Sequence, residues 1–252
     1  MSLFEATLGF ALCGVFISLF MFGVVTVQTF TYYRTFVNDK PALKILIALI
    51  WLLELGIAIC ISMGIYMMLV TNFGNILRLS QIPTSMITAL ILGGISCHLA
   101  QALFIYRIYV LSGKKIVFPI VFGGLSLFLL TIVFLSTAKA FTTVAVQPHS
   151  TEGEGFLSTL FIGSVIEDLS IAVFMCYFLR KQKKASLTST GALLDRLFVF
   201  TVQSCIITSM IAVCGAICFF TMPNNYAWTM PMILIHSSFS NLILSSWVSK
   251  LL

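Results

Sequence analysis

Charged residues are scarce in this chain. It has 14 basic and 8 acidic side chains among 252 residues, which is 9% and about a third of the share in an ordinary soluble domain. A water-soluble domain needs polar surface, and disordered chains are polar and highly charged, so this scarcity excludes both classes. Hydrophobic residues make up 60% of the sequence. The composition therefore predicts a polytopic membrane protein in contact with the lipid bilayer.

Several functional signatures are also missing. The net charge is +6, but the basic residues form no patch with interleaved aromatic residues, so no nucleic-acid partner is expected. The sequence has no Gly-rich phosphate loop and no HExxH motif, and it has only three histidines, so it predicts no cofactor and no metal site. The last apolar segment has no lysine midway along it, which excludes a retinal Schiff base.

Seven long apolar stretches are present, each close to the roughly 20 residues that a membrane-spanning helix requires. Polar or Gly- and Pro-containing breaks separate them, such as Asn38-Asp39-Lys40-Pro41 and Gly113-Lys114-Lys115. We expect an all-α bundle of seven transmembrane helices, forming a single domain over residues 1–252. The predicted helices span residues 4–28, 43–70, 84–111, 116–138, 156–179, 197–221 and 228–249.

The basic residues predict an orientation. Twelve of the 14 lie in the first, third and fifth loops or near the C-terminus, and only Arg78 and Lys139 lie on the other side. Because cytoplasmic loops carry an excess of Lys and Arg, we expect the N-terminus outside and the C-terminus in the cytoplasm. Such a protein would lie in the plasma membrane or in an endomembrane.

Three acidic residues lie deep inside the predicted helices. Glu54 is in the second helix, and Glu167 and Asp168 are in the fifth. A charge near the bilayer centre is costly, so each of these residues needs a reason to be there. No basic residue lies at the same depth, and we expect at least some of the three carboxyls to be protonated.

Other polar side chains lie at neighbouring levels, and two interpretations stay open for the whole set. In the first, the residues line a cavity that binds a ligand, moves a proton or performs acid chemistry. In the second, they are hydrogen-bonded ties between helices. The predicted ligand-binding set is Glu54, His98, Gln101, Glu167, Asp168, His236 and Asn241.

A series of distinctive segments runs along the chain. In order, the segments are ATLGFALCG, GVVTVQTFTYYRTFVND, IWLLELG, QALFIYRIYVLS, EDLSIAVFMCYFL, LLDRLFVFTVQSCIITS and SNLILSSWVS. Taken together, this series resembles a large multi-pass membrane protein family of mushroom-forming fungi (basidiomycetes), known only as a domain of unknown function. The resemblance covers nearly the whole chain and implies a fungal origin and a multi-pass fold. It implies no particular activity.

The residues that match the family also include a group at the predicted inner ends of the helices. We expect these residues to form an ionic network that closes the cytoplasmic face, or else a solvated basic collar at the lipid headgroups. The group comprises Gln28, Asp39, Lys44, Arg107, Tyr109, Asp195 and Arg196.

Three functions follow from these expectations. The first is a receptor-like sensor that binds a small apolar ligand, with a switch near Arg107. The second is an intramembrane enzyme that uses Glu54 and Asp168 as acids on a lipophilic, isoprenoid-like substrate. The third is a proton-linked transporter or channel. We rank binding first, since no catalytic motif is present.

Overall fold

The computed structural model describes residues 3–39, 41–73, 83–142, 151–185, 191–221 and 228–248. Within these ranges it has seven α-helices and a π-helical turn, and it has no strand, which confirms the predicted all-helical class. The helices are α1 (Leu3–Thr35), α2 (Pro41–Tyr66) with the π-helical turn η1 (Met67–Thr71), α4 (Thr84–Leu111), α5 (Val117–Thr142), α6 (Thr151–Ala185), α7 (Gly191–Thr221) and α8 (Thr229–Val248).

Three helices are substantially longer than the sequence predicted. Helix α1 continues to Thr35 instead of ending near residue 28, α6 runs from Thr151 to Ala185 instead of from 156 to 179, and α7 begins at Gly191 instead of at residue 197. Backbone hydrogen bonds within a helix do not require lipid around it, so a helix ends only where the sequence breaks it. Acidic residues near the start of α6 and basic residues near its end also suit the helix dipole.

Five helices are long and apolar enough to cross a membrane, judged over the described residues. The spans are Leu8–Thr35, Pro41–Thr71, Thr84–Leu111, Val117–Lys139 and Ser158–Lys181, and α7 contains a shorter apolar stretch, Ile206–Thr221. This finding supports a membrane-embedded protein. Seven crossings and the orientation of the termini stay predictions.

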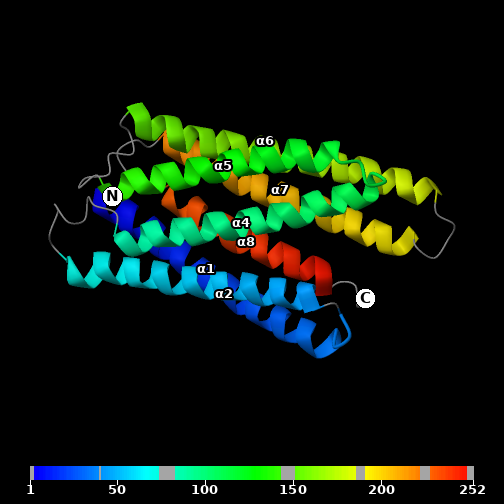
Figure 1. Cartoon of the computed structure of the whole chain (residues 1–252). Helices are drawn as coiled ribbons and strands as arrows, with labels where there is room; N and C mark the ends of the chain where they lie inside the picture. The colour runs from blue at the N-terminus through cyan, green and yellow to red at the C-terminus, as the bar shows by residue number, and fades with distance from the viewer. Residues whose placement is uncertain are drawn as a thin grey trace.

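The helices form one bundle with α4 and α8 at its centre. Helix α4 contacts α2, α5, α6 and α8, and α8 contacts α1, α2, α4 and α7. In Figure 1, α5 and α6 lie on one side of α4, and α1 and α2 lie on the other. The two chain ends, marked N and C, lie at opposite ends of the bundle.

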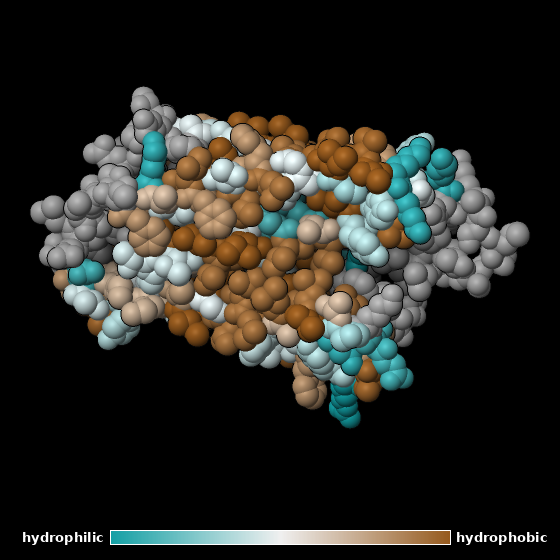
Figure 2. Space-filling view, viewed as in Figure 1, coloured by the Kyte–Doolittle hydropathy of each residue, from teal (hydrophilic) through white to brown (hydrophobic). Residues whose placement is uncertain are grey.

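The distribution of side chains is the reverse of that in a soluble protein. Phe20 is 71% exposed and Phe16 is 62% exposed, whereas the carboxyl residue Glu54 is only 1% exposed. Figure 2 shows an apolar band around the middle of the bundle, with hydrophilic side chains gathered toward its ends. Lipid tails accept apolar side chains, and polar groups turn toward the bundle interior, so this pattern is that of a protein surrounded by lipid.

The turn between α4 and α5 is tight because two successive residues are left-handed. Gly113 has φ of 77° and Lys114 has φ of 64°. Glycine adopts this conformation without a steric cost. The amide of Lys114 donates to the Tyr109 carbonyl (2.9 Å) and thereby caps the end of α4.

Candidate functional site

A buried polar cluster surrounds the carboxyl group of Glu54 on α2. The Ser240 hydroxyl of α8 donates to Oε1 at 2.6 Å, and the Ser96 hydroxyl of α4 lies 3.5 Å from the same oxygen. The Ser237 hydroxyl lies 3.5 Å from Oε2, and the Ser96 and Ser240 hydroxyls are 3.2 Å apart. One acidic side chain therefore joins α2, α4 and α8 through hydroxyl groups.

The cluster extends to α1 through two further contacts. The hydroxyls of Ser18 and Ser237 are 2.9 Å apart. The amide Nδ2 of Asn241 donates to the backbone oxygens of Met21 (3.1 Å) and Ser237 (2.8 Å). In an apolar medium each buried polar group requires such a partner. Glu54 and Asn241 therefore form hydrogen bonds that tie neighbouring helices together.

The other two buried acids lie on α6, and all three acids are near enough to Cys97 to influence its thiol electrostatically. Glu167 is 0% exposed, and neither of its carboxyl oxygens makes a hydrogen bond. Ser126 and Gln101 are near enough to influence Glu167 electrostatically, but their own hydrogen bond joins Ser126 Oγ to Gln101 Oε1 at 3.1 Å. Asp168 is hydrogen-bonded to the side chains of Gln101 and Thr208.

A central cavity lies between α4, α5, α6 and α8. Its empty volume is about 770 Å³, the open space at its mouth included. Most of the lining is apolar and comes from side chains such as Leu129, Val133, Phe161, Ile235 and Phe239. The polar groups include His98, Gln101 and His236, with the hydroxyls of Ser136, Thr137 and Ser164. An apolar lining with a few polar groups is typical of a small-molecule site.

The two histidines of the cavity are held differently. Nδ1 of His98 lies 2.6 Å from the Gly94 carbonyl oxygen. A carbonyl can only accept, so Nδ1 carries the proton there. Nδ1 of His236 lies 3.3 Å from the Cys97 sulfur. Nε2 of both rings is buried and makes no hydrogen bond, which leaves two polar nitrogens of the site without a partner.

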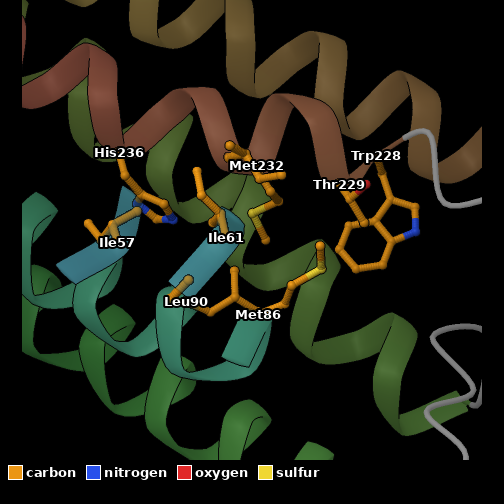
Figure 3. Close-up of a pocket in the computed structure, with 10 residues that line it drawn as sticks. Ile57, Ile61, Met86, Leu90, Trp228, Thr229, Met232 and His236 are labelled. Carbon is orange, nitrogen blue, oxygen red and sulfur yellow. The ribbon is translucent and has the colours of Figure 1, made fainter. Parts of the chain in front are cut away.

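A second cavity, here called the end cavity, lies closer to the end of the bundle where α4 and α8 begin. Its empty volume is about 500 Å³, again with open space included. Figure 3 shows Trp228 at one end of it and His236 at the other, with Met86, Leu90 and Met232 between them. Leu90, Met232 and His236 line both cavities, so these three side chains separate them.

Gly93 makes room for the His236 ring beside α4. A Cβ atom at position 93 would lie 2.4 Å from Cδ2 of His236 and 2.6 Å from its Nε2. Any larger residue would displace the imidazole, since atoms do not approach so closely. The position of His236 between the two cavities therefore depends on a glycine in the middle of a helix.

The predicted ligand-binding set is divided by the fold. His98, Gln101 and His236 line the central cavity, whereas Glu54 and Asn241 belong to the serine cluster, and Glu167 and Asp168 lie on α6 near Gln101. The structure brings in residues that the sequence analysis did not select: Ser18, Gly93, Ser96 and Cys97. The Gly93-Gly94 pair inside an apolar helix is a weak signal for close packing there, since α5 contains a similar pair, Gly123-Gly124, that faces open space.

At the other end of the bundle, two members of the predicted ionic network make hydrogen bonds between α1 and the start of α2. The Tyr32 hydroxyl donates to Asp39 Oδ2 (3.0 Å), and Lys44 Nζ donates to the Val37 carbonyl (2.6 Å). Gln28 Oε1 is buried and makes no hydrogen bond. The two hydrogen bonds stabilise the connection between α1 and α2.

Two remaining members of that group, Arg107 and Tyr109, lie near the end of α4. The Arg107 guanidinium lies 5.8 Å from the centroid of the Phe104 ring, within the range of a cation–π contact. The carbonyl of Tyr109 accepts a hydrogen bond from the Ser112 hydroxyl at 3.0 Å. Asp195 and Arg196 belong to α7, but their side chains lie outside the described residues. The ionic network as a whole stays a prediction.

Residues 164–250, which are 87 of the 252, match a family of unknown function (DUF6534). The matched segment contains α7, α8 and most of α6, and with them Glu167, Asp168, His236 and Asn241. No curated protein and no solved structure matches the chain. The match supports the expected domain of unknown function over this part of the chain, and the fungal origin stays a prediction.

The serine cluster predicts a stability effect. Ser240→Ala removes the shortest hydrogen bond to the buried Glu54 carboxyl. We expect it to lower the free energy of unfolding by about 1 to 3 kcal/mol, the usual loss when a buried acceptor is left without its donor. Denaturant titration of the purified protein in mild detergent measures this loss.

The matched control is Ser238→Ala on the same helix. Ser238 is also buried, but its hydroxyl donates only to the Leu234 carbonyl one turn earlier. We expect its loss to be a few tenths of a kcal/mol, in the range of a local contact. Equal losses for the two variants would show that Glu54 does not join the helices.

Proposed function

We propose that this protein is an integral membrane, receptor-like protein that binds a small apolar ligand in the central cavity. The observation that carries the proposal is the lining of that cavity, which is mostly apolar and has a few polar groups about midway along α4. A ligand dissolved in the bilayer would find there an apolar environment with a small number of hydrogen-bonding groups.

The position of the cavity favours binding over acid catalysis. Glu54, the first candidate acid, is held by hydroxyls of Ser96, Ser237 and Ser240 and is not part of the cavity lining. A general acid must reach the substrate within hydrogen-bonding distance. Glu54 does not meet that condition for a ligand in this cavity.

The receptor-like part of the proposal is supported by the course of α4. The helix lines both cavities through Leu90 and then continues to Arg107 and Tyr109, near the turn to α5. A ligand that displaces α4 at the cavities would therefore also shift the end of α4 that carries Arg107 and Tyr109. Coupling of two sites through one rigid element is an established way of transmitting a signal.

We also propose that the chain crosses the membrane seven times, with its N-terminus outside. The support is the excess of basic residues in alternate loops and the position of the chain ends at opposite ends of the bundle. The excess of basic residues would place the turn around Gly113 in the cytoplasm. It would place the segment between α5 and α6 outside.

The orientation can be measured with two engineered glycosylation acceptors. The sequence contains no Asn-x-Ser/Thr site. Pro148→Asn creates one in the segment that we place outside, and Lys40→Thr creates one in the segment that we place inside. We expect a glycosidase-sensitive mass increase only for Pro148→Asn when the protein is expressed in a eukaryotic host. If only the Lys40→Thr variant is glycosylated, the orientation is the opposite of the one that we propose.

Ligand binding can be measured by photolabelling in lipid nanodiscs with an alkyl diazirine that has a terminal alkyne. We expect the label to concentrate on peptides of α4, α5 and α8 that line the central cavity. Ser136→Phe places a ring in the cavity and should reduce this labelling at least five-fold. Ser136 suits the test because its hydroxyl donates only to the Val133 carbonyl of its own helix.

Leu135→Phe is the matched control. Leu135 is the preceding residue of α5, but it is 49% exposed on the outside of the bundle, so the extra ring would face lipid. We expect unchanged labelling of the cavity peptides in this variant. The binding proposal fails if the label is spread evenly over the lipid-facing helices, or if the two variants reduce it equally.

A further inference from the structure

The Nε2 atom of His236 is a buried polar atom at the boundary of the two cavities. It makes no hydrogen bond, whereas the Nδ1 atom of the same ring contacts Cys97 Sγ. The ring cannot move toward α4, since it already lies against Gly93. A buried imidazole nitrogen without a partner is costly in an apolar site, so a ligand that supplies the partner gains affinity.

The chemistry of that partner follows from the two tautomers of His236. If the Cys97 thiol donates to Nδ1, Nε2 carries the proton and donates. If Nδ1 donates to the sulfur instead, Nε2 is an acceptor. A hydroxyl group both donates and accepts, so it can pair with Nε2 in either tautomer. An ether or a carbonyl can pair with only one of them.

His98 is less suited to this role. Its Nδ1 is committed to the Gly94 carbonyl, and the backbone of Ser126 is also near enough to interact with its ring. His236 has no such backbone neighbour among its described contacts, and it lines both cavities. The lining near His236 includes His98, which is close enough to interact with it electrostatically, and apolar side chains such as Leu90, Met232 and Ile235.

We propose that the ligand is a lipophilic alcohol, whose hydroxyl group binds Nε2 of His236 and whose apolar body fills the central cavity. This inference rests on the proposed function and adds the class of ligand to it. The thiol of Cys97 and the small size of Gly93 are positioning features, because the thiol contacts Nδ1 and the missing side chain at position 93 leaves room beside Nε2.

Competition against the diazirine label tests the inference with a matched pair of probes. The first competitor is 1-dodecanol, and the second is dodecane, which has the same chain but no oxygen and so can pair with Nε2 in neither tautomer. We expect the alcohol to protect the cavity peptides at a concentration about five-fold lower, as one additional hydrogen bond predicts. Nanodiscs without protein give the partitioning of both probes, which is needed to compare free concentrations.

Two substitutions at position 236 complete the test. His236→Phe keeps a flat ring beside Gly93 but removes the nitrogen, so the preference for the alcohol should fall to about one while the alkane protects as before. His236→Gln restores a polar group that donates and accepts, and it should recover part of the preference. Ser238→Ala, on the same helix and outside the cavity lining, should leave the preference unchanged.

The outcomes separate the two proposals. Equal protection by the alcohol and the alkane in the unmodified protein would overturn the inference and leave the proposed binding function standing. A preference that survives in His236→Phe, with thermal unfolding unchanged, would also overturn it, since the hydroxyl would then bind elsewhere. Protection by neither probe would contradict the proposed function itself.

Discussion

The hydrogen bonds of the Glu54 carboxyl determine how the centre of this bundle is arranged. A carboxyl group 1% exposed in a lipid-surrounded protein has no water to satisfy it, so its partners must come from other helices. Ser96 of α4 and Ser237 and Ser240 of α8 supply them, and Ser18 of α1 extends the cluster. The register of four helices is therefore linked to one side chain. The central cavity lies beside the same two helices, α4 and α8, and is lined by Cys97 and His236, neighbours in sequence of Ser96 and Ser237.

Helix α4 has glycines where side chains of two neighbouring helices, α8 and α5, pack against it. Gly93 allows the His236 ring to lie against α4, and the Gly94 position faces Val133 of α5. A larger residue at either position would displace a neighbour that lines the cavity. The polar ties thus fix the register of the helices. The glycine contacts leave room for a side chain between them. This combination is common in membrane helix packing.

Much of the fold could be predicted from the sequence, because a bilayer requires long apolar segments and the breaks between them are polar. Seven helices lie where the sequence analysis placed them, and the main differences concern the ends of α1 and α6 and the start of α7. The sequence did not indicate in the same way which face of each helix points into the bundle. In water, polar residues mark the outer face of a helix, but here both faces are apolar, so periodicity gives little information.

The candidate site was predictable only in part for the same reason. Glu54, His98 and His236 are noticeable because charged and polar residues are rare inside apolar segments. Their partners, Ser18, Ser96 and Cys97, are common in such segments and give no signal. The cavity itself depends on helices far apart in sequence, α4, α5, α6 and α8, so no local pattern could have indicated that His98 and His236 line it while Glu54 does not.

The central claim is that the bundle encloses a cavity that a small molecule occupies between α4, α5, α6 and α8. A cryo-electron microscopy map of the protein in lipid nanodiscs, recorded with and without added 1-dodecanol, tests it most directly. The account predicts elongated density in the central cavity that reaches His236 and strengthens when the alcohol is present. A map in which Leu129, Val133 and Phe239 close the cavity, with no density between them in either sample, would contradict it.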